Sequence, residues 1–119
     1  MALIHSIPLT VGKPLEHFEL EDPLGQRYSS KELYGKGGFL IAVMCNHCSY
    51  SNTIWKRLNT VAEFAKKLDI TTVAINPNIH PNYPEDSPAH MLDKINEVGL
   101  VFPYLIDETQ HVAKSLGAV

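Results

Sequence analysis

Two cysteines separated by two residues constrain this sequence more than any other feature. Cys45 and Cys48 are the only cysteines among the 119 residues. An apolar run at 39–44 precedes them, and a helical pattern at roughly 50–68 follows them. A C-x-x-C motif between a strand and a helix is typical of a dithiol redox site. The sequence therefore predicts an α/β fold that presents two thiols where a helix begins.

The position of Cys45 at a helix N-terminus favours its thiolate. Unpaired backbone N–H groups and the positive end of the helix macrodipole stabilise a negative charge there. Because the thiolate is the nucleophile, we expect Cys45 to attack and Cys48, about one turn further on, to resolve the resulting mixed disulfide. Asn46 and His47 lie between them and would tune the couple, and Tyr50 would line the approach.

Composition and charge exclude several classes of function. The net charge is −3, and no run of Lys and Arg indicates a nucleic-acid surface. No apolar run approaches the ~20 residues of a membrane span, and the first residues lack the pattern of a signal peptide. We therefore expect a cytoplasmic protein with no membrane partner. In that reducing compartment, two close cysteines favour catalysis or metal binding over a structural disulfide.

The hydrophobic pattern predicts one domain in which strands and helices alternate. The expected elements are a hairpin at 18–28, a helical turn capped at Ser29, strands at 39–44, 70–75 and 102–106, and helices at 50–68, 88–98 and 109–116. The strand at 39–44 lacks polar alternation, which predicts burial on both faces. The apolar stripe of the helix at 50–68 is expected to comprise Ile54, Leu58, Val61, Ala65 and Leu68.

The loop at 76–88 follows a strand that we expect to be parallel, which is a common place for a site. Ser87 is expected to cap the next helix, and Pro88 to occupy its first position. Glu85 and Asp86 form a possible acid–base pair, but they more simply favour that helix N-terminus. His80 and His90 are expected at the surface. Trp55 and Phe64 are expected to pack in the core or at the surface rather than to bind substrate.

Several motifs resemble the redoxin branch of the thioredoxin-like superfamily, the AhpC/TSA-like proteins. They are Gly12-Lys13-Pro14, Phe18-Glu19-Leu20-Glu21-Asp22, Cys45-Asn46-His47-Cys48, Ala74-Ile75-Asn76-Pro77-Asn78, Tyr83-Pro84-Glu85-Asp86-Ser87 and the run from Phe102 to Gln110. The later motifs are similar to a subgroup of uncharacterised thioredoxin-family proteins. The resemblance implies a thioredoxin-like fold with an N-terminal hairpin extension, and thiol–disulfide chemistry without an organic cofactor. Electrons would come from a cellular dithiol reductant, and the substrate would be a protein or small-molecule disulfide.

The sequence departs from the family pattern in two places. Related peroxidases carry Pro-x-x-x-Thr-x-x-Cys, whereas the residues from Leu40 to Cys48 contain neither that proline nor that threonine. The family also continues beyond the position of Val119 with a cis-proline loop, two strands and a helix. We therefore expect a single domain over residues 1–119 without the C-terminal β-β-α unit. The strand at 39–44 would then lie at a sheet edge, which favours self-association.

Two other functions compete with a thiol–disulfide oxidoreductase. One is a thiol-dependent peroxidase of the peroxiredoxin type. The other is a non-enzymatic domain that binds a partner or a metal. Cys45, His47 and Cys48 offer soft ligands, but neighbours on one helical turn do not complete a tetrahedron, so His80, His90 or a second chain would have to contribute. We therefore expect no resident metal.

Overall fold

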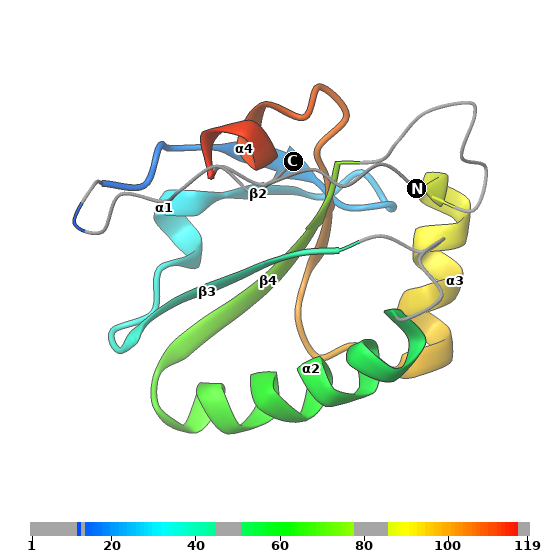
Figure 1. Cartoon of the computed structure of the whole chain (residues 1–119), viewed down its shortest axis with the longest axis horizontal. Coiled ribbons are helices and arrows are strands. Elements are labelled where there is room, and N and C mark those ends of the chain that lie inside the picture. The colour runs from blue at the N-terminus through cyan, green and yellow to red at the C-terminus, as the bar shows by residue number, and fades with distance from the viewer. Residues whose placement is uncertain (1–11, 13, 45–50, 78–85, 117–119) are drawn as a thin grey trace, which may run out of the picture.

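The computed structural model describes residues 12, 14–44, 51–77 and 86–116, which form a sheet covered by helices (Figure 1). In chain order the elements are β1 (Glu19–Glu21), β2 (Arg27–Ser29), α1 (Ser30–Leu33), β3 (Gly38–Val43), α2 (Ser51–Lys67), β4 (Ile70–Asn76), α3 (Pro88–Val98), β5 (Tyr104–Ile106) and α4 (His111–Ser115). This alternation confirms the expected α/β class and the order of the expected elements.

Within these residues the sheet has five strands in the order β2-β1-β5-β4-β3. The central pairs β3–β4 and β4–β5 are parallel, with Val43 opposite Ile75 and Ile75 opposite Leu105. β1 and β2 form the expected antiparallel hairpin, and β1 extends the sheet by pairing with β5. Because β3, β4 and β5 are parallel, their carboxyl ends lie at the same end of the sheet.

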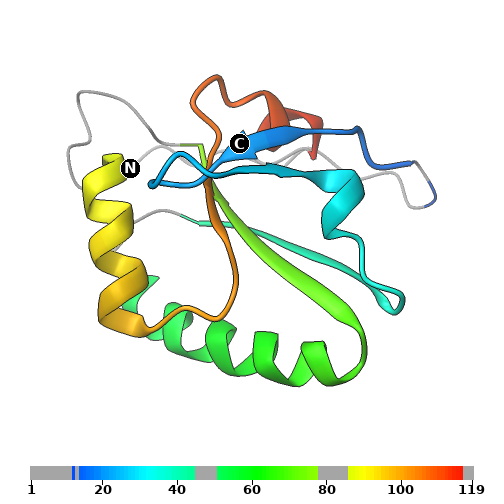
Figure 2. The same ribbon diagram turned by 180° about the vertical axis from the view of Figure 1, so that it is seen from behind.

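Successive side chains of β4 point to opposite faces of the sheet and enter two separate cores. Ala74 packs with side chains of α2, α3 and β5 in a first cluster. Val73 and Ile75 pack with Phe18, Leu105 and Val112 in a second cluster on the other face. Figures 1 and 2 show the same division, with α2 and α3 on one side of the sheet and α4 on the other.

Local signals at the helix ends agree with the structure. Ser29 caps α1 and accepts a hydrogen bond from the Lys31 amide. Ser87 caps α3 by accepting from the His90 amide, and Pro88 occupies its first turn. Gly99 ends α3 with a φ of 72°, a left-handed conformation that glycine adopts without steric cost.

The buried face of α2 agrees with the predicted stripe at Leu58 and Ala65 but not at its other three residues. Ile54, Val61 and Leu68 are 47%, 49% and 54% exposed, so they do not belong to the core. The side chains that are buried on α2 are Trp55, Ala62 and Ala65, with Leu58 partly buried beside them. The exposed and the buried residues each recur at helical spacing, so periodicity alone does not distinguish the two faces of α2. The face that carries the indole of Trp55 is the one that packs against β4 and β5.

The predicted burial of β3 on both faces is also wrong. None of its residues is fully buried, and Val43 is 37% exposed. The reason is its position, because among the described residues β3 pairs only with β4 and forms an edge of the sheet. β4 is the most buried strand, since it pairs on both sides and both of its faces are covered.

The remaining strand and helices bear on the site only indirectly. Pro103 directly precedes β5, a position where proline does not interrupt the hydrogen bonds of the strand. α4 begins at His111, two residues later than expected. Of the helices that the structure describes, none combines the length and the hydrophobicity needed to cross a bilayer.

Candidate functional site

The sequence-predicted site residues Cys45, Asn46, His47, Cys48 and Tyr50 lie outside the described residues. The structure instead defines what precedes and follows them. β3 ends at Val43, and α2 begins at Ser51. The motif therefore joins the carboxyl end of a strand to the beginning of a helix, as the sequence predicts.

Met44 fixes the chain immediately before the motif. Its backbone amide donates to the Ile75 carbonyl at 2.8 Å, which continues the β3–β4 ladder by one residue. Its partly buried side chain packs against the first core cluster. The chain thus leaves the sheet beside the end of β4, next to Asn76.

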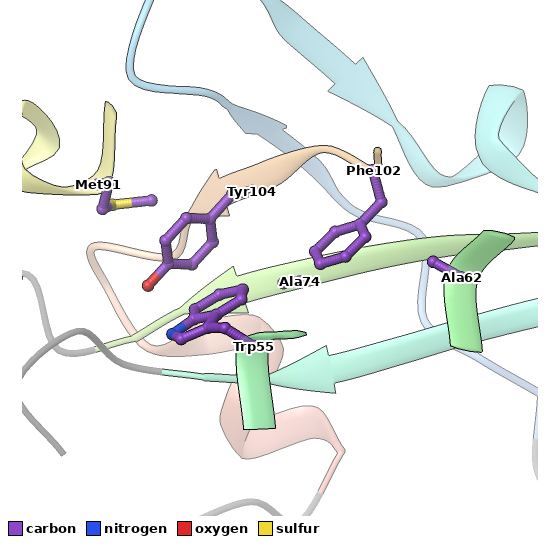
Figure 3. Packing of buried hydrophobic residues seen from close by; sticks show 6 residues of the cluster. All are labelled: Trp55, Ala62, Ala74, Met91, Phe102 and Tyr104. Atoms are coloured by element: carbon purple, nitrogen blue, oxygen red, sulfur yellow. The ribbon is translucent and has the colours of Figure 1, made fainter. Parts of the chain in front are cut away.

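Trp55 fixes the first part of α2 after the motif. Its side chain is fully buried, with its ring centroid 4.7 Å from that of Tyr104 in an edge-on contact and 6.3 Å from that of Phe102 in a stacked one. Figure 3 shows the indole next to the ring of Tyr104, which begins β5, and facing the ring of Phe102, which lies two residues before it. Trp55 therefore packs in the core and Phe64, which is 64% exposed, lies at the surface, the two placements that the sequence allowed.

A buried polar network lies at the carboxyl end of β4, where the hydroxyl of Tyr104, the first residue of β5, reaches Asn76. Asn76, Asp86 and Tyr104 are each fully buried. The Asn76 Nδ2 group donates to Asp86 Oδ1 at 3.0 Å and to the Tyr104 hydroxyl oxygen at 3.1 Å. Burial raises the pKa of Tyr104 far above its ordinary value, and the Asp86 charge raises it further, while the Asn76 hydrogen bond acts in the opposite direction. The phenol therefore stays protonated at neutral pH.

The indole N–H of Trp55 lies at the same end of the first core cluster. It is buried and has no hydrogen-bond partner among the described residues. In Figure 3 the indole nitrogen and the Tyr104 oxygen point toward the same end of the cluster. A buried donor without a partner is uncommon because it loses its hydration without compensation.

Asp107 stabilises the carboxyl end of β5 from the other side. Its carboxylate is buried and accepts from the Val112 and Ala113 amides at 3.3 and 2.8 Å, in the first turn of α4. Its own amide donates to the Asn76 carbonyl at 3.0 Å. The Gln110 side chain also donates to the Pro77 carbonyl. These bonds hold the ends of β4 and β5 together.

The sequence did not identify this polar network. Asp86 was expected to favour the N-terminus of α3, but its side chain is buried and bonded to Asn76. Glu85, its proposed partner, lies outside the described residues. The signal available was that a polar Asn76 ends the apolar strand β4 just before the proline-rich loop.

Other features offer no second site at this edge. Within 14–44, 51–77 and 86–116, no three His, Cys, Asp or Glu side chains come together as metal ligands would. His90 is exposed and its ring nitrogen lies 2.7 Å from the Ser87 hydroxyl, while His80 lies outside the described residues. An open cleft of about 860 Å³ lies at the other end of the sheet, near the amino ends of β3 and β4. Its lining includes Lys36, Asp69 and Thr71.

Comparison with known proteins identifies the family. Residues 11–119 match the model of the AhpC/TSA family. The chain belongs to the AhpC/TSA family. No curated protein matches it in sequence. An uncharacterized conserved protein from Geobacillus kaustophilus has 34% sequence identity and a TM-score of 0.92, and the match covers 99% of this chain and 63% of that one. The present chain thus spans less than two thirds of the length of that protein.

Two more distant structures share the thioredoxin-like fold of this AhpC/TSA chain. A peroxidoxin from Mycobacterium tuberculosis has a TM-score of 0.76 at 15% identity, over 92% of this chain and 67% of its own. A secreted disulfide oxidoreductase from the same organism has a TM-score of 0.67 at 18% identity, over 82% of this chain and 66% of its own. Both of the chemistries that the sequence left open therefore occur among proteins of this fold.

Proposed function

We propose that this protein is a thiol–disulfide oxidoreductase in which Cys45 and Cys48 form the redox couple. The observation that carries the proposal is the place of the C-x-x-C motif, between Met44 at the end of β3 and Ser51 at the beginning of α2. Membership of the AhpC/TSA family supports it. A helix that begins directly after a dithiol favours the thiolate form.

The proposed reaction transfers two electrons from the dithiol to a disulfide. The Cys45 thiolate attacks one sulfur of a partner disulfide and forms a mixed disulfide, and the first partner thiolate leaves and takes up a proton. The Cys48 thiolate then attacks Cys45 Sγ, which closes the Cys45–Cys48 disulfide and releases the second partner thiol. A cellular dithiol reductant returns the couple to its reduced state, and no organic cofactor takes part.

The intervening and neighbouring residues have proposed roles that follow from their chemistry. Protonated His47 would stabilise the Cys45 thiolate and make the couple more oxidising. Asn46 would adjust the geometry of the turn, and Tyr50 would contact the substrate. We further propose a cytoplasmic location, where a reducing environment would keep Cys45 and Cys48 from remaining a permanent disulfide.

Disulfide reduction by purified variants tests the proposal. Wild-type protein should reduce insulin or a small aromatic disulfide over many turnovers. Cys45→Ser should show no reaction. Cys48→Ser should react once and stop, because it retains the nucleophile and lacks the resolving thiol. Equal multiple-turnover activity in Cys45→Ser and wild type would overturn the proposal.

A peroxidase is the second candidate, and the family and the peroxidoxin neighbour favour it. The absence of the peroxidase proline and threonine before Cys48 opposes it. The same variants separate the two chemistries when peroxide replaces the disulfide. We expect slow peroxide consumption. Rapid, Cys45- or Cys48-dependent peroxide turnover without disulfide reduction would reverse the ranking.

A further inference from the structure

The open cleft near the amino ends of β3 and β4 has no role in the proposed thiol chemistry. Its volume of about 860 Å³ lies within the range of about 300–1,000 Å³ that is usual for sites of small organic molecules. One wall is the segment before β3, where the Gly37 amide donates to the Asp69 carbonyl at 2.8 Å (Figure 1). A Cβ atom at Gly35 would collide with the same carbonyl oxygen, so this wall is packed tightly against the turn between α2 and β4.

A second wall is the segment that leads into β5, and α2 holds it in place. The Asn59 side chain of α2 donates to the Gly99 carbonyl at 3.1 Å and accepts from the Val101 amide at 2.8 Å. The Phe102 ring stacks on Trp55, with 6.3 Å between the two centroids (Figure 3). Because contacts within the described chain fix both walls, the cleft does not depend on a ligand for its shape.

Thr72 of β4 provides the observation that points to a ligand. It lines the cleft and lies on the same face of β4 as Ala74, because residues two apart on a strand share a face. Thr72 is 5% exposed, and its hydroxyl oxygen is buried without a hydrogen-bond partner among the described residues. A buried hydroxyl of this kind is costly, so a ligand oxygen that reached it would supply the missing partner. Because the hydroxyl is covered, that contact requires rotation of the Thr72 side chain.

The charge and the polarity of the lining select the chemistry of the ligand. The charged side chains are three lysines and two carboxylates: Lys36, Lys66, Lys67, Glu63 and Asp69. They leave one positive charge in excess, whereas the whole chain has a net charge of −3. None of the three lysines forms an ion pair with an acidic residue in the described part of the chain. The apolar part of the lining consists of Ala62, Ile70, Val101, Phe102 and Pro103. This combination suits one negative charge on an apolar body.

We propose that this cleft binds a small monocarboxylate with an apolar body, such as an arylalkanoate or a short fatty acid. The lysines attract the carboxylate, the apolar body packs against Phe102, and the Thr72 hydroxyl donates to a ligand oxygen. The dithiol motif follows the carboxyl end of β3, roughly 17 Å along the strand from its amino end. The site is therefore separate from the proposed thiol chemistry and does not rest on it.

Titration of the whole chain, followed by two-dimensional amide nuclear magnetic resonance, tests the proposal. The probe is hydrocinnamate, and hydrocinnamyl alcohol and phenylpropylamine are its neutral and cationic counterparts. Lys36→Gln combined with Lys66→Gln removes two charges from the cleft. Lys31→Gln combined with Lys114→Gln is the matched control, because both lysines are exposed and neither lines the cleft.

Two substitutions at Thr72 separate binding from stability. Thr72→Val removes the hydroxyl and keeps the shape, whereas Thr72→Ser keeps a hydroxyl. Urea unfolding of each variant, followed by circular dichroism, measures stability. Because the hydroxyl has no partner to lose, the urea midpoint of Thr72→Val should be no lower than that of wild type.

We expect hydrocinnamate to shift the amides of the cleft saturably, with a Kd of about 1 mM or below. The alcohol should bind about five- to tenfold more weakly, and the amine should not saturate. The cleft lysine pair should weaken hydrocinnamate binding about fivefold, and the control pair should leave it within about twofold of wild type. Thr72→Val should weaken it about three- to tenfold, and Thr72→Ser should restore most of the affinity.

No saturation below about 10 mM hydrocinnamate, or shifts centred away from the cleft, would overturn the inference. Equal affinity for the acid and the alcohol would overturn it too, as would an equal loss in the two lysine pairs. A lower urea midpoint in Thr72→Val would mean that the hydroxyl already has a partner in the folded protein, which removes the argument for a ligand. Shifts of the cleft amides on dilution alone would show that a second copy of the chain occupies the cleft instead.

Discussion

Replacing Trp55 by phenylalanine should change stability far less than its complete burial suggests. The side chain is fully buried between β5 and α2, and truncation of such a residue to alanine costs about 3–5 kcal/mol. The indole N–H, however, has no partner among the described residues, and an unsatisfied buried donor costs about 1–3 kcal/mol. Phenylalanine removes that donor and keeps most of the aromatic contact with Tyr104 and Phe102.

Trp55→Phe therefore changes the free energy of unfolding through two effects that are of similar size and opposite sign. The smaller ring loses buried area and leaves a small cavity, at a cost of about 1–2 kcal/mol. Removal of the indole N–H, which has no partner among the described residues, stabilises the folded protein by about the same free energy. We expect the free energy of unfolding of Trp55→Phe to lie within about 1 kcal/mol of wild type, and that of Trp55→Ala to fall by about 3–5 kcal/mol.

Urea unfolding followed by far-ultraviolet circular dichroism measures both variants. Fluorescence is unsuitable, because Trp55 is the only tryptophan of the chain. Equal m-values would show that the variants differ in stability and not in the surface exposed on unfolding. A loss of 3 kcal/mol or more in Trp55→Phe would refute the reasoning, since it would mean that the indole N–H is satisfied in the folded protein.

Three further predictions follow from the described residues. Asp107→Ala should cost about 1–2 kcal/mol in urea unfolding, because the first-turn amides of α4 lose their acceptor, and a loss below about 0.3 kcal/mol would contradict this. Because the pKa of Tyr104 is raised in the folded protein, its contribution to stability is complete below the unfolded pKa of about 10 and declines as pH rises above it. Thermal melts at several pH values above about 10 should show this decline as a falling melting temperature in wild type and as a smaller fall in Tyr104→Phe. Equal slopes of melting temperature against pH in the two proteins would contradict the raised pKa of Tyr104. The edge strand β3 should cause self-association, which light scattering at several dilutions should detect. Val43→Lys places a charge on this strand and should weaken the association. Val101→Lys, at an exposed position outside β3, is the control and should leave the association unchanged. A wild-type mass that stays monomeric at micromolar concentration would contradict it.

Local signals were sufficient to predict most of the fold. The capping residues Ser29 and Ser87, the glycine at 99 and the β-branched run of β4 each act within a few residues of their own position. For this reason the element order and the parallel β3–β4 pair agree with the sequence. The choice between two stripes on α2 depended instead on contacts with distant strands, which is why the sequence favoured Ile54 and Val61 over Trp55.

The candidate site was predicted only in part, for a similar reason. The C-x-x-C motif is local, so its place between a strand and a helix was evident from the sequence. The network of Asn76, Asp86 and Tyr104 joins residues up to 28 positions apart, and no spacing in the sequence indicates it. The edge position of β3 agrees with the expectation drawn from the family resemblance, whereas its apolar composition favoured burial on both faces because composition does not show which strands pair with it.

Trapping of a mixed disulfide tests the central claim most directly. Cys48→Ser protein is mixed with a small aromatic disulfide, and intact mass is measured after the excess reagent is removed. We expect one stable adduct per chain, located at Cys45 and released by a reductant. Recovery of Cys48→Ser without an adduct, while Cys45→Ser forms one at Cys48, would contradict the assignment of Cys45 as the nucleophile.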